Sequence, residues 1–305
     1  MKNNIKPHLA LLGTNVFFAI NFTAIKFLFN NKFTLPFGLN FSRMIGTTIL
    51  LWIMYFFSKN KESINRIHYK RFFICTLLGI AINQLLFIKG LSLTNTVHAS
   101  LLMLTTPIFI TIIAAWILKE KLTTNKTIGL LLGIAGSTLL ILSRSASGNA
   151  KDILLGDFYI IVNAISYSYY FVLVKPLMKR YDSLTVIRTL FTMGCVVALP
   201  FCWSEFIQTP WSTYTPEAYG ALALVVIGGT FLAYLFNLYG IKHLGASVSG
   251  SYIYSQPLFA TIIAMIFLGE TIDLTKIIAA VCIFLGVYFV NRMTAVDNET
   301  SDNID

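Results

Sequence analysis

The sequence contains the same apolar segment twice, 150 positions apart. Residues 107–120 read PIFITIIAAWILKE, and residues 257–270 read PLFATIIAMIFLGE. Eight of these fourteen positions are identical, including the proline that opens each segment and the glutamate that closes it. Such a gapless match indicates that the chain is an internal duplication. An internal repeat in a strongly apolar chain is typical of membrane transporters.

The rest of the chain is also apolar. Of its 305 residues 56% are hydrophobic and only 12% are charged, whereas a soluble protein carries about 25% charged residues. Stretches of about 20 apolar residues span a bilayer as helices. Ten such stretches occur, at roughly 8–29, 37–57, 72–91, 97–118, 126–143, 154–174, 183–203, 217–241, 247–268 and 274–292. The sequence therefore predicts an all-α polytopic membrane protein with ten transmembrane helices.

The duplication divides these helices into two repeats of five. The first repeat is predicted to cover residues 1–145 and the second residues 146–293, followed by a short polar cytoplasmic tail at 294–305 that is expected to be disordered. Five is an odd number, so the second repeat enters the membrane upside down relative to the first. We therefore expect two inverted five-helix repeats.

Lysine and arginine predict the orientation in the membrane. Loops 58–71, 119–126 and 175–182 contain at least three basic residues each, whereas loop 204–216 contains none. Basic residues accumulate on the cytoplasmic side, so both termini are predicted to lie in the cytoplasm of a multi-pass protein of the inner (plasma) membrane. The net charge of +10 follows from this asymmetry, and the lipid bilayer rather than nucleic acid is the expected partner.

Each repeat has a proline in the middle of an apolar helix. Pro107 and Pro257 each remove a helical hydrogen bond and repel the carbonyl group four residues earlier, which belongs to Met103 and Ile253 respectively. Freed carbonyls at membrane depth need protein or water as partners. Interrupted helices at matching places indicate a substrate site, so both prolines are candidate structural hinges. A curved helix without a function is the alternative.

Polar and aromatic side chains interrupt the apolar helices at helical spacing. Asn163, Tyr167 and Tyr170 share one helix face, and Tyr252 and Gln256 share another. An amide group in hydrocarbon needs a hydrogen-bond partner, which either a neighbouring helix or a substrate supplies. The candidate substrate-binding residues are Asn21, Asn83, Gln84, Asn163, Tyr167, Tyr170, Tyr234, Asn237, Tyr252 and Gln256.

Two arginines also lie within predicted helices. Arg43 and Arg188 are each several residues from a helix end, and an intramembrane arginine must face protein or water because its transfer into lipid is costly. Each of them either bonds carbonyls at helix ends or attracts anionic groups of a substrate. The sequence alone leaves both readings open.

Motifs for catalysis, metal binding and ATP hydrolysis are absent from the sequence. It has no phosphate-binding loop, and its four histidines are scattered near helix ends without metal-ligand spacing. The thirteen Asp and Glu residues lie in loops, tails or helix ends, so no relay of buried acids for proton pumping is visible. We therefore expect no cofactor, no metal and no enzymatic activity, and we expect facilitated transport or exchange.

The repeated motifs carry a resemblance to a known family. The pattern Ala19-x-Asn21-Phe-x-Ala24-x-Lys26 and the paired Pro107…Glu120 and Pro257…Glu270 segments resemble the EamA-type transporters of the drug/metabolite transporter superfamily. The resemblance covers residues 8–292. It implies two inverted five-helix halves around a central cavity lined by helices 1, 3, 4, 6, 8 and 9. It also implies movement of amino acids, related metabolites or drugs across the inner membrane.

These observations predict a secondary transporter that works by alternating access. The expected substrate is a small polar or amphipathic metabolite such as an amino acid, with export as the expected direction and a monomer or homodimer as the expected assembly. A flippase subunit for a lipid-linked sugar is the alternative among transporters. A receptor or an intramembrane enzyme is the alternative from another class, but the duplication argues against the first and the absence of paired catalytic groups against the second.

Overall fold

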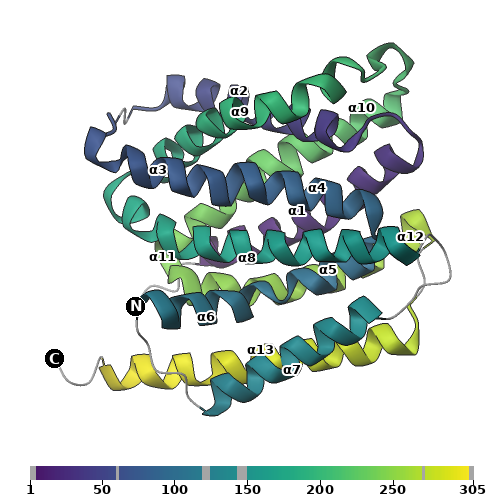
Figure 1. The fold of residues 1–305 in the computed structure, drawn as a ribbon. Coiled ribbons are helices and arrows are strands. Elements are labelled where there is room, and N and C mark those ends of the chain that lie inside the picture. The colour runs from purple at the N-terminus through teal and green to yellow at the C-terminus, as the bar shows by residue number, and fades with distance from the viewer. Residues whose placement is uncertain (1–4, 60–61, 119–123, 143–149, 270–271, 302–305) are drawn as a thin grey trace.

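The computed structural model describes residues 5–59, 62–118, 124–142, 150–269 and 272–301, and this part of the chain is helical apart from short connections (Figure 1). The first repeat contains α1 (Ile5–Asn30), α2 (Pro36–Phe57), η1 (Arg66–His68), α3 (Tyr69–Thr76), η2 (Leu77–Ala81), α4 (Ile82–Leu93), α5 (Thr96–Met103), α6 (Thr106–Leu118) and α7 (Thr124–Leu142). The second contains α8 (Ala150–Arg180), α9 (Ser183–Ile207), η3 (Trp211–Thr213), α10 (Pro216–Ala223), η4 (Leu224–Leu232), α11 (Ala233–Ser251), η5 (Tyr252–Ser255), α12 (Gln256–Leu268) and α13 (Leu274–Ser301).

The described helices have the lengths and surfaces of membrane spans. Six of them are long and apolar enough to cross a bilayer, and shorter apolar helices lie at 96–110, 127–136 and 277–286. Large apolar side chains also cover the outside of the bundle: Phe56, Trp116 and Phe267 are each more than 70% exposed. In a water-soluble fold such a surface would promote aggregation. The all-α membrane architecture predicted from the sequence is confirmed.

Two boundaries differ from the prediction. Helical backbone continues across residues 242–246, where a connection was expected, so that α11 runs from Ala233 to Ser251. Likewise α13 continues to Ser301, through a tail that was expected to be disordered. Both expectations were based on the lower content of apolar residues in these two segments. Neither segment contains a proline, the residue that most strongly ends a helix, so the helical hydrogen-bond pattern extends past the last apolar residue.

The helices pack in pairs that follow an approximate two-fold axis. Helix α2 packs along α9 and α7 packs along α13, and in both pairs each helix meets its own counterpart from the other repeat. Between these pairs, α4 packs on α8 as α11 packs on α1, and α6 packs on α8 as α12 packs on α1. These contacts of one repeat therefore have their equivalents in the other, as expected of an inverted repeat.

Individual hydrogen bonds obey the same symmetry. The side-chain amide of Asn163 donates to the backbone carbonyl of Asn83, with 2.6 Å between the atoms. At the equivalent place, 149 and 150 positions away, the Thr14 hydroxyl donates to the carbonyl of Ala233 over 3.3 Å. The two repeats thus use different side chains to join the same pair of helix positions. Because the two repeats have the same backbone arrangement but different side chains, the space between the repeats is lined asymmetrically.

Each repeat also contains one helix segment with wider turns. Segments η2 and η4 are π-helical, and they occupy matching positions in the two repeats. The amide of Gln84 donates to the Tyr234 hydroxyl over 3.4 Å, and these two residues are separated by the repeat spacing of 150. Such π-helical insertions are frequent at functional sites. In this chain they directly precede α4 and α11, the helices whose equivalent residues Gln84 and Tyr234 meet.

Glycines in the π-helical segments make this packing possible. A Cβ atom at Gly79 would overlap the ring of Tyr170, and one at Gly229 would overlap the side chain of Asn21. We expect Gly79→Ala and Gly229→Ala each to lower the free energy of unfolding in detergent by about 1–3 kcal/mol, because overpacking displaces neighbouring side chains. Gly220→Ala is the matched control, since nothing lies within 4 Å of its Cβ position. If Gly220→Ala were as destabilising as the other two, the loss would not come from overpacking.

Candidate substrate cavity

A cavity lies at the centre of the bundle between the two repeats. Only about 70 Å³ of it is open to water-sized molecules, so the cavity is narrow in this conformation. It is lined by Phe18, Asn21, Phe22, Arg43, Asn83, Gln84, Phe87, Met103, Thr106, Asn163, Tyr167, Tyr234, Asn237, Ile253 and Gln256. Eight of the ten candidate substrate-binding residues are in this set. The other two, Tyr170 and Tyr252, are not.

Tyr170 lies one helical turn beyond Tyr167 on α8. Its ring packs into the space left by Gly79, its centroid is 5.6 Å from that of Tyr167, and its side chain is almost fully buried. The ring occupies the space that the missing side chain of Gly79 leaves in η2, and Tyr170 is not among the residues that line the cavity. Tyr170 therefore supports the wall that Tyr167 presents to the cavity.

Tyr252 points toward the end of α1 instead. Its hydroxyl lies 2.7 Å from Nδ1 of His8. The expectation that Tyr252 shares a face with Gln256 assumed an α-helix, in which residues four apart differ by about 40° around the axis. Residue 252 belongs to the 3₁₀ segment η5, whose three residues per turn rotate its side chain away from that of Gln256.

The helices that contain the two prolines are interrupted where the sequence predicts. Helix α5 ends at Met103 and α6 begins at Thr106, while η5 separates α11 from α12. Met103 and Ile253, the residues four positions before the prolines, both line the cavity. So do Thr106 and Gln256, which are equivalent in the two repeats. The interruptions therefore place backbone from both repeats at the cavity wall.

Arg43 is the cationic side chain of the cavity. It is 3% exposed, its Nε donates to the Thr230 hydroxyl over 3.2 Å, and its guanidinium carbon is 5.8 Å from the centre of the Phe87 ring. Arg188 lies outside the set that lines the cavity, so the two arginines have different surroundings, and Arg43 alone introduces a positive charge into this wall.

Several polar atoms around the cavity lack a hydrogen-bond partner in the described part of the chain. They are Nη1 of Arg43 and the side-chain oxygens of Asn21, Gln84 and Asn163, all of them buried. Leaving a buried polar group unpaired costs about 1–3 kcal/mol, and most such groups in proteins have a partner. A guanidinium group is a preferred partner for a carboxylate, and amide oxygens accept hydrogen bonds from ammonium or hydroxyl groups.

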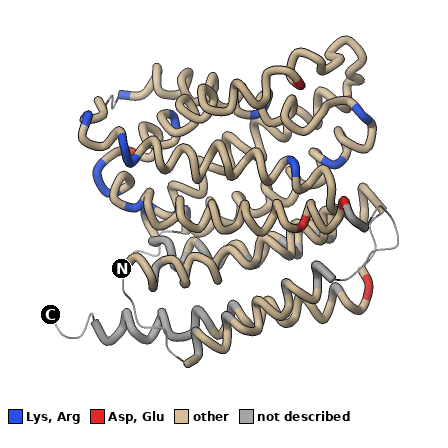
Figure 2. The backbone as a smooth tube through the Cα atoms, viewed as in Figure 1, with Lys and Arg blue, Asp and Glu red and all other residues tan. Residues whose placement is uncertain are grey.

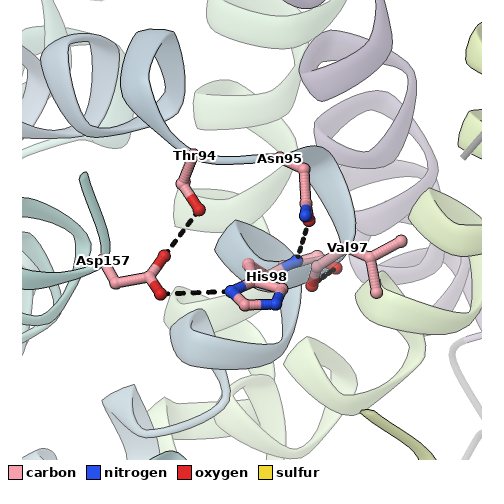
Figure 3. Close-up of polar contacts among 6 residues, drawn as sticks. Thr94, Asn95, Val97, His98 and Asp157 are labelled. Atoms are coloured by element: carbon pink, nitrogen blue, oxygen red, sulfur yellow. Dashed lines mark hydrogen bonds and ion pairs between the residues drawn. The ribbon is translucent and has the colours of Figure 1, made fainter. Parts of the chain in front are cut away.

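A second polar cluster links α5 to α8 near one end of the bundle (Figure 3). Asp157 is fully buried: the Thr94 hydroxyl donates to its Oδ1 over 2.6 Å, and Nδ1 of His98 lies 3.1 Å from its Oδ2. Asn95 accepts from the backbone N–H of His98 over 2.7 Å and so caps the start of α5. Nε2 of His98 is buried without a partner among the described residues.

The other end of the bundle has a related contact. His8 occupies the position in the first repeat that Asp157 occupies in the second, 149 residues later. Its bond to Tyr252 joins α1 to η5, just as the bond of Asp157 to His98 joins α8 to α5. One ionisable side chain per repeat thus fastens the interrupted helix of the other repeat. Sequence analysis did not predict the contact between Asp157 and His98, because the two residues are 59 positions apart in the sequence.

Comparison with known proteins identifies the fold. The sequence profile of the EamA-like transporter family matches residues 5–142 and again residues 154–292. The chain belongs to this family. The family repeat thus occurs twice in the chain, as the duplication and the two-fold packing require.

Individual relatives agree with this assignment. The EamA-like chain is 26% identical to an uncharacterized transporter of Archaeoglobus fulgidus over 93% of its length and 97% of the relative. It is 28% identical to the uncharacterized transporter YoaV of Bacillus subtilis, with 83% and 85% of the two chains covered. A solved crystal structure with 17% identity has the same fold, with a TM-score of 0.63 over 94% of this chain and 98% of the other. The protein is therefore a membrane transporter of the EamA-like family.

Proposed function

We propose that the protein exports a small polar metabolite with an anionic group, such as an amino acid, and binds it in the central cavity. The observation that carries this proposal is the set of unpaired polar atoms on Arg43, Asn21, Gln84 and Asn163 around one narrow space. Arg43 is positioned to bind a carboxylate, and the amide oxygens are positioned to bind an ammonium group. The aromatic rings of Tyr167 and its neighbours would cover the apolar part of such a molecule.

The size of the cavity favours a small solute over a lipid-linked sugar. Pockets for drug-sized ligands have volumes of about 300–1,000 Å³, whereas the central cavity in this conformation has only about 70 Å³ open to water-sized molecules. The lining also combines amides with aromatic rings from both repeats, as a binding site for a polar molecule requires. A flippase for a long lipid would need a wide opening toward the bilayer.

Alternating access is the mechanism that the two end contacts support. The His98–Asp157 contact and the His8–Tyr252 contact lie at equivalent places in the two repeats. We propose that these repeats are residues 1–145 and residues 146–293. In the proposed cycle one contact opens while the other stays closed, and the interruptions before Pro107 and Pro257 act as hinges. Binding energy of the substrate would compensate for the broken contact.

The distribution of charge supports the proposed orientation. Most described lysine and arginine residues gather at the end where α2 leads into α3 and α8 into α9, whereas most described acidic residues lie toward the opposite end (Figure 2). Basic residues mark the cytoplasmic side. We therefore place both termini in the cytoplasm and the segment around η3 outside, in the inner membrane.

Labelling of introduced cysteines tests this orientation. Both Thr213, in η3, and Asn65, before η1, are exposed. In a background without the four native cysteines, Thr213→Cys is expected to react with a membrane-impermeant maleimide in intact cells, and Asn65→Cys only after lysis. The reverse result would overturn the orientation.

Transport itself is tested in proteoliposomes loaded with radiolabelled metabolites. A panel of amino acids, sugars, organic cations and a lipid-linked sugar separates the substrate classes, and efflux from inside-out and right-side-out vesicles separates the directions. We expect amino acids or similar zwitterions to leave the vesicles faster than from empty-membrane controls. Movement of the lipid-linked sugar alone would overturn the proposal in favour of a flippase.

A further inference from the structure

A second and more open pocket lies on the outer face of the bundle between α2, α3 and α9. It is lined by Trp52, Ile64, Tyr69, Lys70, Phe73, Arg188, Thr189, Thr192 and Met193, none of which lines the central cavity. About 590 Å³ of it is open to water-sized molecules. Trp52, Tyr69 and Phe73 on its rim are roughly half exposed. The pocket therefore opens toward the surroundings of the bundle and is separate from the proposed transport path.

Arg188 is the buried cation of this pocket. Its side chain is 8% exposed, although the residue lies only five positions after the start of α9 at Ser183. Its guanidinium carbon is 3.6 Å from the centre of the Tyr55 ring and 4.5 Å from that of Trp52. Nε of Arg188 is buried and has no hydrogen-bond partner among the described residues. Aromatic rings attract a guanidinium ion, but they satisfy none of its N–H donors.

The carboxylates at this end of the bundle are engaged elsewhere. Glu62 accepts from the backbone N–H of Asp182 over 2.8 Å, and Asp182 pairs with Lys242 over 3.1 Å. Burial alone would raise the pKa of Asp182, but hydrogen bonds from Lys242 and from two backbone N–H groups outweigh it and hold that pKa below its usual value. In the described part of the chain no carboxylate forms an ion pair with Lys70 or Arg188. Among the described residues, the pocket thus has two cations and no carboxylate paired with them.

We infer that this pocket binds the headgroup of an anionic phospholipid. The phosphodiester group would accept hydrogen bonds from Arg188 and Lys70, since guanidinium and ammonium groups are the usual phosphate partners in proteins. The acyl chains would leave over Phe73 and Met193 onto the apolar outer surface. Tyr69 and Trp52 belong to the aromatic residues that prefer the headgroup level of a bilayer.

A lipid fits this pocket better than free phosphate for two reasons. The rim is apolar and exposed, so it is covered by hydrocarbon when the protein is in a membrane. The adjoining segment 58–71 is rich in lysine and arginine, and basic clusters next to transmembrane helices attract anionic lipids. Arg188 then adds a specific, buried contact to this general attraction.

Quenching of Trp52 fluorescence by brominated lipids tests the inference without any transport substrate. The variant Trp116→Phe/Trp203→Phe/Trp211→Phe keeps Trp52 as its single tryptophan and is placed in phosphatidylcholine vesicles with a minor share of brominated lipid. Two charges near the surface favour an anionic lipid by about 10- to 30-fold. We therefore expect brominated phosphatidylglycerol to quench Trp52 at a correspondingly lower mole fraction than brominated phosphatidylcholine, with no relief by inorganic phosphate.

Charge variants decide whether the pocket is responsible. Arg188→Gln/Lys70→Gln should remove most of the preference for phosphatidylglycerol and leave only the weaker general attraction of the basic segment. Lys59→Gln/Arg66→Gln is the matched control: it removes two exposed positive charges from the same segment outside the pocket and should retain most of the preference. The inference would be overturned by equal quenching in the parent or by relief with phosphate. It would also be overturned if the pocket variant lost no more of the preference than the control. Thermal unfolding of every variant in detergent checks that the fold is retained.

Discussion

Replacing Asp157 with alanine is expected to lower the free energy of unfolding by about 2–6 kcal/mol, because two buried hydrogen-bonding groups lose their partner at a cost of about 1–3 kcal/mol each. Both carboxylate oxygens of Asp157 are in hydrogen bonds, one from Thr94 and one with His98. In the alanine variant these two groups stay buried without a partner. Chemical or thermal unfolding in detergent, followed by circular dichroism, measures the loss.

Two companion variants make this prediction specific. Asp157→Asn keeps the shape and an acceptor for Thr94, so we expect a smaller loss than with alanine. Asp152→Ala removes an exposed carboxylate from the first turn of the same helix, where interaction with the helix dipole contributes less than about 1 kcal/mol. If all three variants unfold alike, Asp157 makes no special contribution to stability.

The burial of Asp157 also bears on energy coupling. Facilitated transport was expected because every carboxylate lies in a loop, a tail or near a helix end. Asp157 is indeed near the start of α8, but α4 approaches α8 so closely at Gly90 and Gly156 that a Cβ atom on either would meet the other's backbone oxygen at 2.9 Å. That contact buries the carboxylate. A buried carboxylate inside the bundle removes the main reason for that expectation, which stays a prediction to be tested with an imposed pH gradient.

The parts of the structure that sequence analysis predicted are those with local causes. The lengths of the apolar stretches predict the helices, and the repeat predicts their inverted arrangement. Pro107 and Pro257 predict the interruptions beside the cavity. Polar residues at helical spacing gave most of the cavity wall, because an amide in a membrane helix has few places to point except inward. These features can be predicted from the spacing of residues along the sequence, without knowing which helices pack together.

The parts that it missed depend on contacts between distant segments. Tyr170 turns toward Gly79, which lies 91 positions earlier, and Tyr252 follows the 3₁₀ geometry of η5. The two arginines looked equivalent in the sequence, but Arg43 meets Thr230 at the cavity whereas Arg188 meets Tyr55 at the outer pocket. Which neighbour a side chain meets is decided by packing across the repeats.

Substitution of Arg43 is expected to have the largest effect on transport. If Arg43 binds the carboxylate of the substrate, Arg43→Gln removes a charge-assisted hydrogen bond of about 1.5–3 kcal/mol, which corresponds to about 10- to 140-fold in affinity. Gln256→Leu removes a neutral partner at the opposite wall and is expected to cost somewhat less. Uptake by proteoliposomes at sub-saturating concentrations of the amino acid found in the panel measures both.

Further variants separate binding from folding. Arg43→Lys keeps the charge but loses the planar fork of donors, so an intermediate affinity is expected. Thr230→Val removes the hydrogen-bond partner of Arg43 and leaves its charge in the cavity, and it should weaken transport far less than Arg43→Gln. A substrate analogue with an amide in place of the carboxylate should bind the parent and Arg43→Gln with similar affinity, because neither can then form the ionic contact. Parent-like uptake of the amino acid by both Arg43→Gln and Gln256→Leu would mean that the substrate binds outside the central cavity.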